Sequence, residues 1–354
     1  MNIHIVTFHR ALNYGAVLQA YALYRSVAKL APAGSGVFIL DHKNSHIDQL
    51  YSVLPSGTNL RALPAASVSL PAKAVKKARF KKFLEGQTVL SREDNAEGIF
   101  IAGSDQVWNL RCTGGDRAYF LDFVKDNDKK NAYAASFGAG DVEPRYAAEI
   151  GELLSGFRNI SVREQEGRRI VEALTGREAP VVLDPTLLLD AGEWGRVASK
   201  SKFKGAYVLL YTMTITPSIA RFAAALAREK GLPLLHITDS VKRVVPGSIL
   251  KNHAGPQEWL RLFLDAETVV TNSFHGTAAA VNFNKPFFTE LLPEPSKVNG
   301  RLIHLLELFG LRGRLIEGGA PSPADTPIDY TAVNIILSRE REFSLEYLRG
   351  VVGG

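Results

Sequence analysis

The sequence has little sulfur and no long apolar run. Its 354 residues include one cysteine, Cys112, and a single cysteine excludes both a disulfide framework and a thiolate metal cluster. No apolar run approaches the roughly 20 residues that a membrane-spanning helix needs. Residues 1–8 read as a short strand, without the basic start and apolar core of a signal peptide. These absences are typical of a reducing compartment, and we expect a cytoplasmic location.

The chain is too long for one small core, and its pattern indicates parallel α/β architecture. A length of 354 residues predicts two domains. Short apolar segments alternate with helical ones in both halves. The predicted strands are Ile3–Phe8, Gly36–Asp41, Gly98–Ala102, Ala132–Ser136, Ile160–Arg163, Pro180–Leu183, Ala206–Tyr211, Leu234–Ile237, Thr268–Thr271 and Pro286–Thr289. The predicted helices include Ala16–Leu30, Pro217–Lys230, Gly255–Asp265, Leu302–Phe309 and Tyr330–Arg349.

A segment rich in glycine, serine and lysine, Leu189–Lys204, separates the two halves and is the expected hinge. We predict an N-terminal Rossmann-like domain over residues 1–190, a C-terminal one over 205–320, and a connector with a terminal helix over 321–354. The predicted fold is α/β, with the two Rossmann-like domains facing each other across a cleft. Ligands of such sheets bind beyond the carboxyl ends of the strands, so the candidate site residues are those that follow a strand.

The most informative strand end is the segment 269–280, with the sequence VVTNSFHGTAAA. An apolar β-branched run stops at a polar turn, and a pattern of small residues typical of a helix starts at once. The N-terminus of that helix offers amide groups and a positive dipole end, which suit an anion such as a phosphate. His275 in the turn is a candidate proton donor near neutral pH. The alternative is an ordinary junction of strand and helix with a packed histidine.

Four further positions near element ends carry polar side chains. Asn13 suits either a tight turn or contact with a ligand. In Ser104–Asn109, polar side chains surround Trp108, which is a common way to hold a sugar ring, and the alternative is a core tryptophan. Arg163 is suited to bind a carboxylate or phosphate, unless it forms a surface ion pair. Arg301, just before a predicted helix, is a candidate for the same cleft.

Other kinds of site lack their sequence signals. The absence of GxGxxG excludes the usual dinucleotide fingerprint, so we predict no cofactor of that kind. The histidines lack the spacing of metal ligands, so we predict no metal site. Ser273 lies outside any Gly-x-Ser-x-Gly motif, which leaves little support for a hydrolase triad. The net charge of +6 comes without a nucleic-acid recognition motif, so nucleic acid is not an expected partner.

Four motifs, in this order and spacing, resemble the polysaccharide pyruvyl transferase family over about residues 1–315. They are NYGAVLQA at 13–20, GSDQVWN at 103–109, SVRE at 161–164 with VLDPT at 182–186, and TNSFHGT at 271–277. The resemblance implies a GT-B-like fold of two facing Rossmann-type domains. It also implies transfer of pyruvate from phosphoenolpyruvate to a sugar of a cell-surface polysaccharide or of its lipid-linked precursor, usually as a ketal across two hydroxyls.

The resemblance also assigns roles to residues of this chain. It implies that Arg163 binds the donor and that His275 is the catalytic acid. Some relatives carry a second donor arginine two residues before that histidine, where this chain has Ser273, and Arg301 is the expected replacement. The full expected donor-binding set is Arg163, Asn272, Ser273, Gly276, Thr277 and Arg301. The expected acceptor-binding set is Asn13, Tyr14, Gly15, Gln19, Ser104, Asp105, Gln106 and Trp108.

Two other classes of function fit parts of the sequence. A glycosyltransferase of the same fold would use a nucleotide sugar and would need a ribose-binding carboxylate, for which Asp239 and Glu258 are candidates. A non-catalytic glycan-binding protein on this fold would need neither His275 nor Arg163, so their presence argues against it. These classes can be distinguished by testing which donor protects the protein from thermal unfolding, because a ligand that binds only the native state stabilises that state.

A basic segment, residues 73–82, contributes much of the positive charge. It holds six cations with Val75 and Phe80 interleaved. As a helix, it would be a basic amphipathic surface suited to an anionic glycan or to an anionic membrane, such as the inner face of the cytoplasmic membrane. The other interpretation is a solvated helix face.

Overall fold

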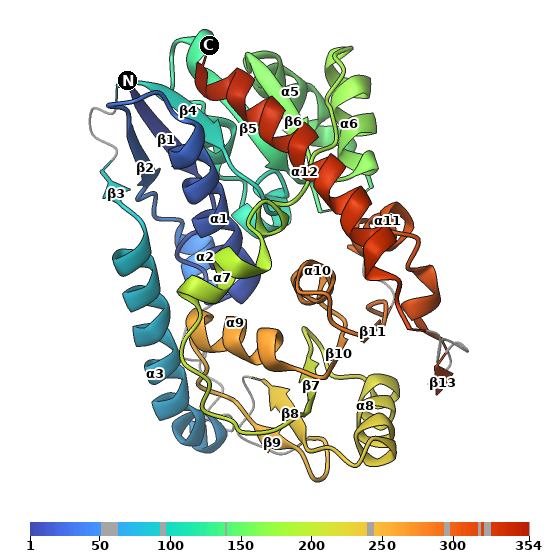
Figure 1. The fold of residues 1–354 in the computed structure, drawn as a ribbon. Helices are drawn as coiled ribbons and strands as arrows, with labels where there is room; N and C mark the ends of the chain where they lie inside the picture. Colours follow the sequence, from blue (N-terminus) through green and yellow to red (C-terminus); the bar gives the residue numbers. More distant parts are fainter. Residues whose placement is uncertain are drawn as a thin grey trace. The chain divides into compact units, whose positions relative to one another are not determined.

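The chain, described here as a computed structural model, divides into two compact units that each contain a parallel sheet (Figure 1). The structure describes residues 1–50, 63–92, 97–138, 140–238, 244–293, 298–317, 320–321 and 327–353. The first unit comprises Met1–Tyr51, Leu84–Leu189 and Ser338–Gly354, and the second comprises Ser52–Phe83 and Asp190–Leu337. Within the described ranges, no helix is both long enough and apolar enough to span a bilayer.

The sheet of the first unit has the strand order β3-β2-β1-β4-β5-β6, with every neighbouring pair parallel. Ile3, Ile5 and Val6 of β1 are fully buried, as expected of a strand covered on both faces. The strand order reverses between β1 and β4, so their carboxyl ends border the switch point where such sheets bind ligands. The strands are β1 (Asn2–Val6), β2 (Gly36–Leu40), β3 (Leu90–Ser91), β4 (Ile99–Ala102), β5 (Lys130–Ala135) and β6 (Asn159–Val162).

Helices connect these strands, and the last helix of the chain returns to the first unit. Ser344 of that helix accepts the amide N–H of Leu183 at 2.9 Å. Tyr347 donates to the carbonyl oxygen of Ala132, also at 2.9 Å, so two side chains bind the helix to β5 and to the segment after β6. The helices are α1 (Tyr14–Leu30), α2 (Ser45–Leu50), α4 (Leu110–Thr113), α5 (Pro144–Ser155), α6 (Gln165–Thr175) and α12 (Tyr330–Gly353), with short 3-10 turns at Arg117–Phe120, Asn127–Lys129 and Pro185–Leu187.

The sheet of the second unit has the order β11-β10-β7-β8-β9 and is also parallel. Its core includes Val208 and Val270, which pack with Phe222 of the covering helix α8. The strands are β7 (Val208–Tyr211), β8 (Leu234–Ile237), β9 (Ile249–Leu250), β10 (Thr268–Thr271) and β11 (Phe287–Thr289), and β12 (Ile316–Glu317) pairs antiparallel with β13 (Ala320–Pro321). The helices are α3 (Leu63–Gln87), α7 (Ala191–Val197), α8 (Pro217–Glu229), α9 (Pro256–Asp265), α10 (Phe274–Asn282) and α11 (Gly300–Leu308), followed by a 3-10 turn at Arg312–Arg314.

The predicted fold class is confirmed, because both units are α/β with parallel strands. Two predicted segments differ in detail. Pro180–Leu183 is no strand in the described structure: Val181 makes a single bridge to Val162, since a proline at the start supplies no amide N–H to a ladder. The expected hinge contains helix α7, which begins with a capping box and buries Trp194.

Candidate active site

The turn after β10 places a histidine at the start of α10. β10 ends at Thr271 and α10 begins at Phe274. Ser273 is the N-cap residue, and its hydroxyl oxygen accepts the amide N–H of Gly276 at 3.4 Å, as serine often does before a helix. His275 is half-buried. It therefore stands at a helix N-terminus, where the dipole favours an anion.

Close packing inside this turn explains the residues around the histidine. A Cβ added to Gly276 would lie 2.4 Å from Thr271 Oγ1 and 3.1 Å from Tyr211 Cδ1. Thr277 is fully buried, and its hydroxyl donates to the carbonyl oxygen of Ser273 at 3.1 Å. The amides of Gly276 and Thr277 both donate to Ser273. These two expected donor-binding residues thus have contacts that hold the turn against the sheet.

Asn272, also in the expected donor-binding set, fixes the turn to the loop after β7. Its Oδ1 accepts the amide N–H of Met213 at 2.8 Å, and its Nδ2 donates to the carbonyl oxygen of Thr214 at 2.6 Å. The residue is 2% exposed. Both ends of the carboxamide are therefore bonded within the protein, which fits a positioning role for the carboxyl edge of β10 and β7.

Arg301 and His275 lie on the same phenylalanine. The guanidinium carbon of Arg301 is 5.7 Å from the centroid of the Phe274 ring, a cation–π distance. The ring of His275 meets that of Phe274 edge-on, at 5.2 Å between centroids. Both polar side chains are half-buried, and each stands in the first turn of its helix, α11 or α10. The structure thus places an imidazole and a guanidinium on one phenylalanine ring.

In the first unit, Arg163 follows β6 and lies among carboxylates. Its side chain is 1% exposed. Nη1 donates to Asp184 Oδ2 at 2.9 Å, Nε is 3.5 Å from Glu164 Oε2, and Nη2 is 3.8 Å from Asp105 Oδ1. Burial alone would lower the pKa of Arg163, but the Asp184, Glu164 and Asp105 carboxylates raise it above its ordinary value. The guanidinium is therefore charged, and it already has carboxylate partners within the protein.

Sequence reasoning selected Ser104 and Asp105 as site residues, but it did not select the other residues that complete this cluster. Asp184 Oδ1 accepts from the amide and the hydroxyl of Thr186 at 2.9 and 2.7 Å. Ser104 donates to Asp184 Oδ2 at 3.3 Å, and Ser136 donates to Glu164 Oε1 at 2.6 Å. The available signal was the VLDPT motif, in which an aspartate follows an apolar run directly. Together these bonds order the carboxyl edge of the first sheet.

The turn between β1 and α1 joins the same edge. Asn13 caps α1, and its side chain accepts the amide N–H of Ala16 at 3.3 Å. Gln19 is fully buried and donates to Thr7 Oγ1 at 2.8 Å, and Thr7 in turn donates to the carbonyl oxygen of Ser104 at 2.9 Å. The structure thus brings the predicted residues after β1 and β4 together. Tyr14 and Gly15 are buried in the first turn of α1.

Within the segment after β4, the structure separates edge residues from core residues. Asp105 adopts a φ of 75° and bridges to Ala135, a backbone conformation that aspartate tolerates better than most residues. Trp108 is 1% exposed, and its indole N–H donates to the carbonyl oxygen of Tyr119 at 3.1 Å. Its ring stacks on Phe120 at 5.8 Å. Trp108 thus has the surroundings of a core residue, with no ring face open to a sugar. Gln106 accepts from the side-chain amide of Asn109 at 2.8 Å.

The predicted site residues form two groups, one in each unit. Among the described residues, no cluster of three or more His, Cys, Asp or Glu side chains could hold a metal ion. Of the two carboxylates that a nucleotide-sugar enzyme would need, Asp239 lies outside the described residues. Glu258 accepts the amide N–H of Gly255 at 2.9 Å and pairs with Arg79 and Lys202. Glu258 is therefore engaged in the capping box at the start of α9 and in two ion pairs.

Comparison with known proteins gives one family and a set of distant structures. The family model described as polysaccharide pyruvyl transferase matches residues 13–289. Similar structures include UDP-GlcNAc 2-epimerase of Methanocaldococcus jannaschii in complex with UDP-GlcNAc and UDP (13% identity, 96% of this chain and 94% of that chain, TM-score 0.47). A second is UDP-GlcNAc 2-epimerase of Neisseria meningitidis bound to UDP-GlcNAc (11% identity, 96% of this chain and 99% of that chain, TM-score 0.45). A third is heptosyltransferase WaaC of E. coli with ADP (13% identity, 96% of this chain and 100% of that chain, TM-score 0.42). No curated protein sequence matches the chain.

Proposed function

Because this chain belongs to the polysaccharide pyruvyl transferase family, we propose that it transfers the pyruvyl group of phosphoenolpyruvate to a sugar as a ketal. The acceptor is a sugar of a cell-surface polysaccharide or of its lipid-linked precursor. One observation carries the proposal: His275 and Arg301 flank the Phe274 ring in the first turns of two helices. This arrangement offers an acid, a cation and two positive helix ends to a donor with a carboxylate and a phosphate.

The reaction requires one proton donor and a means of stabilising phosphate. In our proposal His275 protonates C3 of the enol while a sugar hydroxyl oxygen bonds to C2. The C2–O bond to phosphate then breaks, and phosphate leaves with the bonding electrons. A second hydroxyl of the sugar bonds to C2 and closes the ketal. Of the two hydroxyl protons, one replaces the proton given by His275 and the other leaves with the phosphate.

The other predicted residues take supporting roles in this proposal. Arg301 binds the carboxylate or the phosphate of the donor and stabilises the departing charge. Arg163 remains the proposed second donor cation, and it would exchange part of its contact with Asp184 for the donor. Ser273 and Asn272 hold the turn that orients His275. The edge formed by Asn13, Asp105 and Gln106 is the proposed acceptor side.

The test is to incubate the protein with phosphoenolpyruvate and a panel of lipid-linked and nitrophenyl sugars. The expected product has the mass of the acceptor plus one pyruvic acid minus one water, with release of inorganic phosphate in equal amount. Thermal stabilisation by phosphoenolpyruvate, but not by UDP-GlcNAc, is expected alongside. Stabilisation by the nucleotide sugar with no ketal product from any acceptor would overturn the proposal in favour of a glycosyltransferase.

A further inference from the structure

The first unit contains a hollow that the proposed reaction does not use. Its volume is about 800 Å³, large enough for a ligand of several rings. None of the predicted donor or acceptor residues lines it. Its lining residues include His42, Phe100, Asp116, Phe123, Asp126 and Lys129. We call this hollow the crossover groove, because residues 115–129 belong to the connection between β4 and β5.

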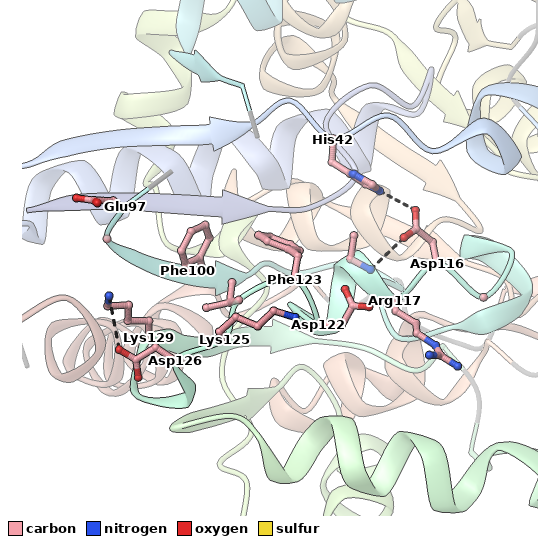
Figure 2. A pocket seen from close by; sticks show the side chains of 14 residues that line it. His42, Glu97, Phe100, Asp116, Arg117, Asp122, Phe123, Lys125, Asp126 and Lys129 are labelled. Atoms are coloured by element: carbon pink, nitrogen blue, oxygen red, sulfur yellow. Dashed lines mark hydrogen bonds and ion pairs between the residues drawn. The ribbon is translucent and has the colours of Figure 1, made fainter. Parts of the chain in front are cut away.

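An exposed aromatic ring lies in the crossover groove. Phe123 is 40% exposed, and its ring meets the ring of Phe100 on β4 edge-on at 5.6 Å between centroids. Figure 2 shows both rings near the middle of the groove. Phe100 supports Phe123 from the sheet side, while part of the Phe123 ring stays open to solvent. A supported but exposed ring is a suitable platform for the apolar face of a sugar.

Hydrogen-bonding groups of both signs surround the ring. Toward one end of the groove lie Glu97, Asp126 and Lys129, and Lys129 pairs with Asp126 at 3.5 Å (Figure 2). Among the residues that the structure describes, the lining contains four carboxylates, from Glu97, Asp116, Asp122 and Asp126, and three cations, from Arg117, Lys125 and Lys129. A lining so close to neutral does not attract a polyanion such as a nucleoside diphosphate. It does supply the donors and acceptors that several hydroxyl groups need.

The other end of the groove is rigidly arranged. His42 Nε2 lies 2.6 Å from Asp116 Oδ2, and Asn44 donates to the same oxygen at 2.8 Å. Asp116 also accepts the amide N–H of Ala118 through Oδ1 at 3.0 Å. Burial by itself would raise the pKa of Asp116, but the hydrogen bonds from His42, Ala118 and Asn44 bring it below its ordinary value. Fixed polar groups of this kind lower the entropy cost of binding a polar ligand.

We propose that the crossover groove binds a short segment of an uncharged or weakly charged glycan, with one sugar ring stacked on Phe123. The inference rests on the cavity, the exposed ring and the balanced polar lining of one unit. It goes beyond the proposed transfer reaction, because the groove would bind glycan without phosphoenolpyruvate and without His275. The two proposals can therefore fail separately.

The experiment uses the full chain on a printed array of bacterial polysaccharides and their repeating-unit oligosaccharides, without phosphoenolpyruvate. The oligosaccharide that binds most tightly on the array is then titrated into the wild-type protein, Phe123→Ala and Phe123→Trp. We expect Phe123→Ala to weaken binding by roughly tenfold or more, as truncation of an aromatic anchor does, and Phe123→Trp to retain it. The matched control is Phe343→Ala, which removes another exposed phenyl ring of the same unit, 50% exposed on α12.

A second readout locates the ligand independently of affinity. The oligosaccharide should slow amide hydrogen exchange within residues 115–129, in wild type and in His275→Ala alike. Three outcomes would each overturn the proposal. The first is that no glycan on the array binds, and the second is that Phe123→Ala and Phe343→Ala lose equal affinity for the oligosaccharide. The third is that the oligosaccharide protects amide hydrogens elsewhere but not in residues 115–129. Displacement of the oligosaccharide by ADP or UDP would also overturn it, because it would identify the groove as a nucleotide site.

Discussion

At the scale of single residues, His275 is the side chain whose removal should affect chemistry more than structure. It is half-buried at the start of α10. We expect His275→Ala to lower kcat by roughly 10²–10⁴-fold, the usual range for a lost general acid, with little change in melting temperature or in phosphoenolpyruvate binding. Steady-state kinetics with the best acceptor measures this. His253→Ala, an exposed histidine of the same unit, is the control, and equal rates in both variants would reject the assignment.

Arg163 should affect stability first. Its side chain is 1% exposed and pairs with Asp184 at 2.9 Å, so Arg163→Ala leaves buried carboxylates without their cation. Breaking a buried pair from one side costs about 3–5 kcal/mol of unfolding free energy, measurable by urea denaturation. Arg117→Ala removes an exposed pair with Glu149 and should cost less than about 1 kcal/mol. A small effect of Arg163→Ala would contradict the structural role.

The donor role of Arg163 needs a variant that keeps the charge. Arg163→Lys retains a cation but lacks the planar fork that binds a carboxylate or phosphate through two bonds. If the donor contacts Arg163, this variant should raise the KM for phosphoenolpyruvate with a smaller loss of melting temperature than Arg163→Ala. An unchanged affinity for phosphoenolpyruvate, measured by calorimetric titration, would leave Arg163 as a positioning residue alone.

At the scale of elements, the close contact of α10 with the sheet depends on a glycine, Gly276. A Cβ at Gly276 would lie 2.4 Å from Thr271 Oγ1, whereas one at Gly195 in α7 would meet nothing within 4 Å. Gly276→Ala should therefore destabilise the protein by about 1–3 kcal/mol through overpacking. Gly195→Ala should stabilise it by about 0.5–1 kcal/mol, because alanine is the better helix former. If chemical denaturation showed that both substitutions stabilise the protein, α10 would have to accommodate the added Cβ without strain.

The basic segment of α3 has less of a free apolar face than its sequence pattern suggested. Phe80, Phe83 and Leu84 are buried, and Lys76 is 4% exposed with its ammonium 5.5 Å from the Phe80 ring. Exposed cations of this segment include Lys77, Lys81 and Lys82. Three such cations contribute at most about 3 kcal/mol at an anionic surface, less at physiological salt.

We therefore expect the protein to stay in the supernatant when sedimented with anionic vesicles at physiological salt. Binding at low salt should be weak and should disappear when Lys77, Lys81 and Lys82 are changed to glutamate. Strong sedimentation at low salt that weakens with added salt and is lost in the glutamate variant would instead support the attachment to an anionic membrane that the charge pattern allows.

At the scale of the whole molecule, sequence periodicity predicted the two parallel sheets and the strand–turn–helix around His275. That prediction succeeded because these signals are local: an apolar run, a polar turn and small residues follow one another in the chain. The pairing of Arg163 with Asp184 was not predictable, since it joins positions 21 residues apart that meet only once β6 and the following segment are placed. Trp108 was equally ambiguous, because polar neighbours surround a core tryptophan and a sugar platform alike.

The whole molecule should also lose stability in mild acid, and His236 on β8 gives the reason. It is 1% exposed, neither ring nitrogen has a hydrogen-bond partner among the described residues, and burial lowers its pKa to about 4. In the unfolded chain His236 takes up a proton near pH 6.5, whereas in the folded protein it does so only at about pH 4. The contribution of neutral His236 to the free energy of unfolding is therefore fully present above pH 6.5 and is lost as the pH falls toward about 4. The loss amounts to roughly 3 kcal/mol, the free energy of a shift of that size. Urea denaturation between pH 7 and pH 4 should show the decline in wild type and in His253→Leu, which changes an exposed histidine and serves as the control. The decline should be absent in His236→Leu. An equal decline in all three proteins would assign the loss of stability to other groups.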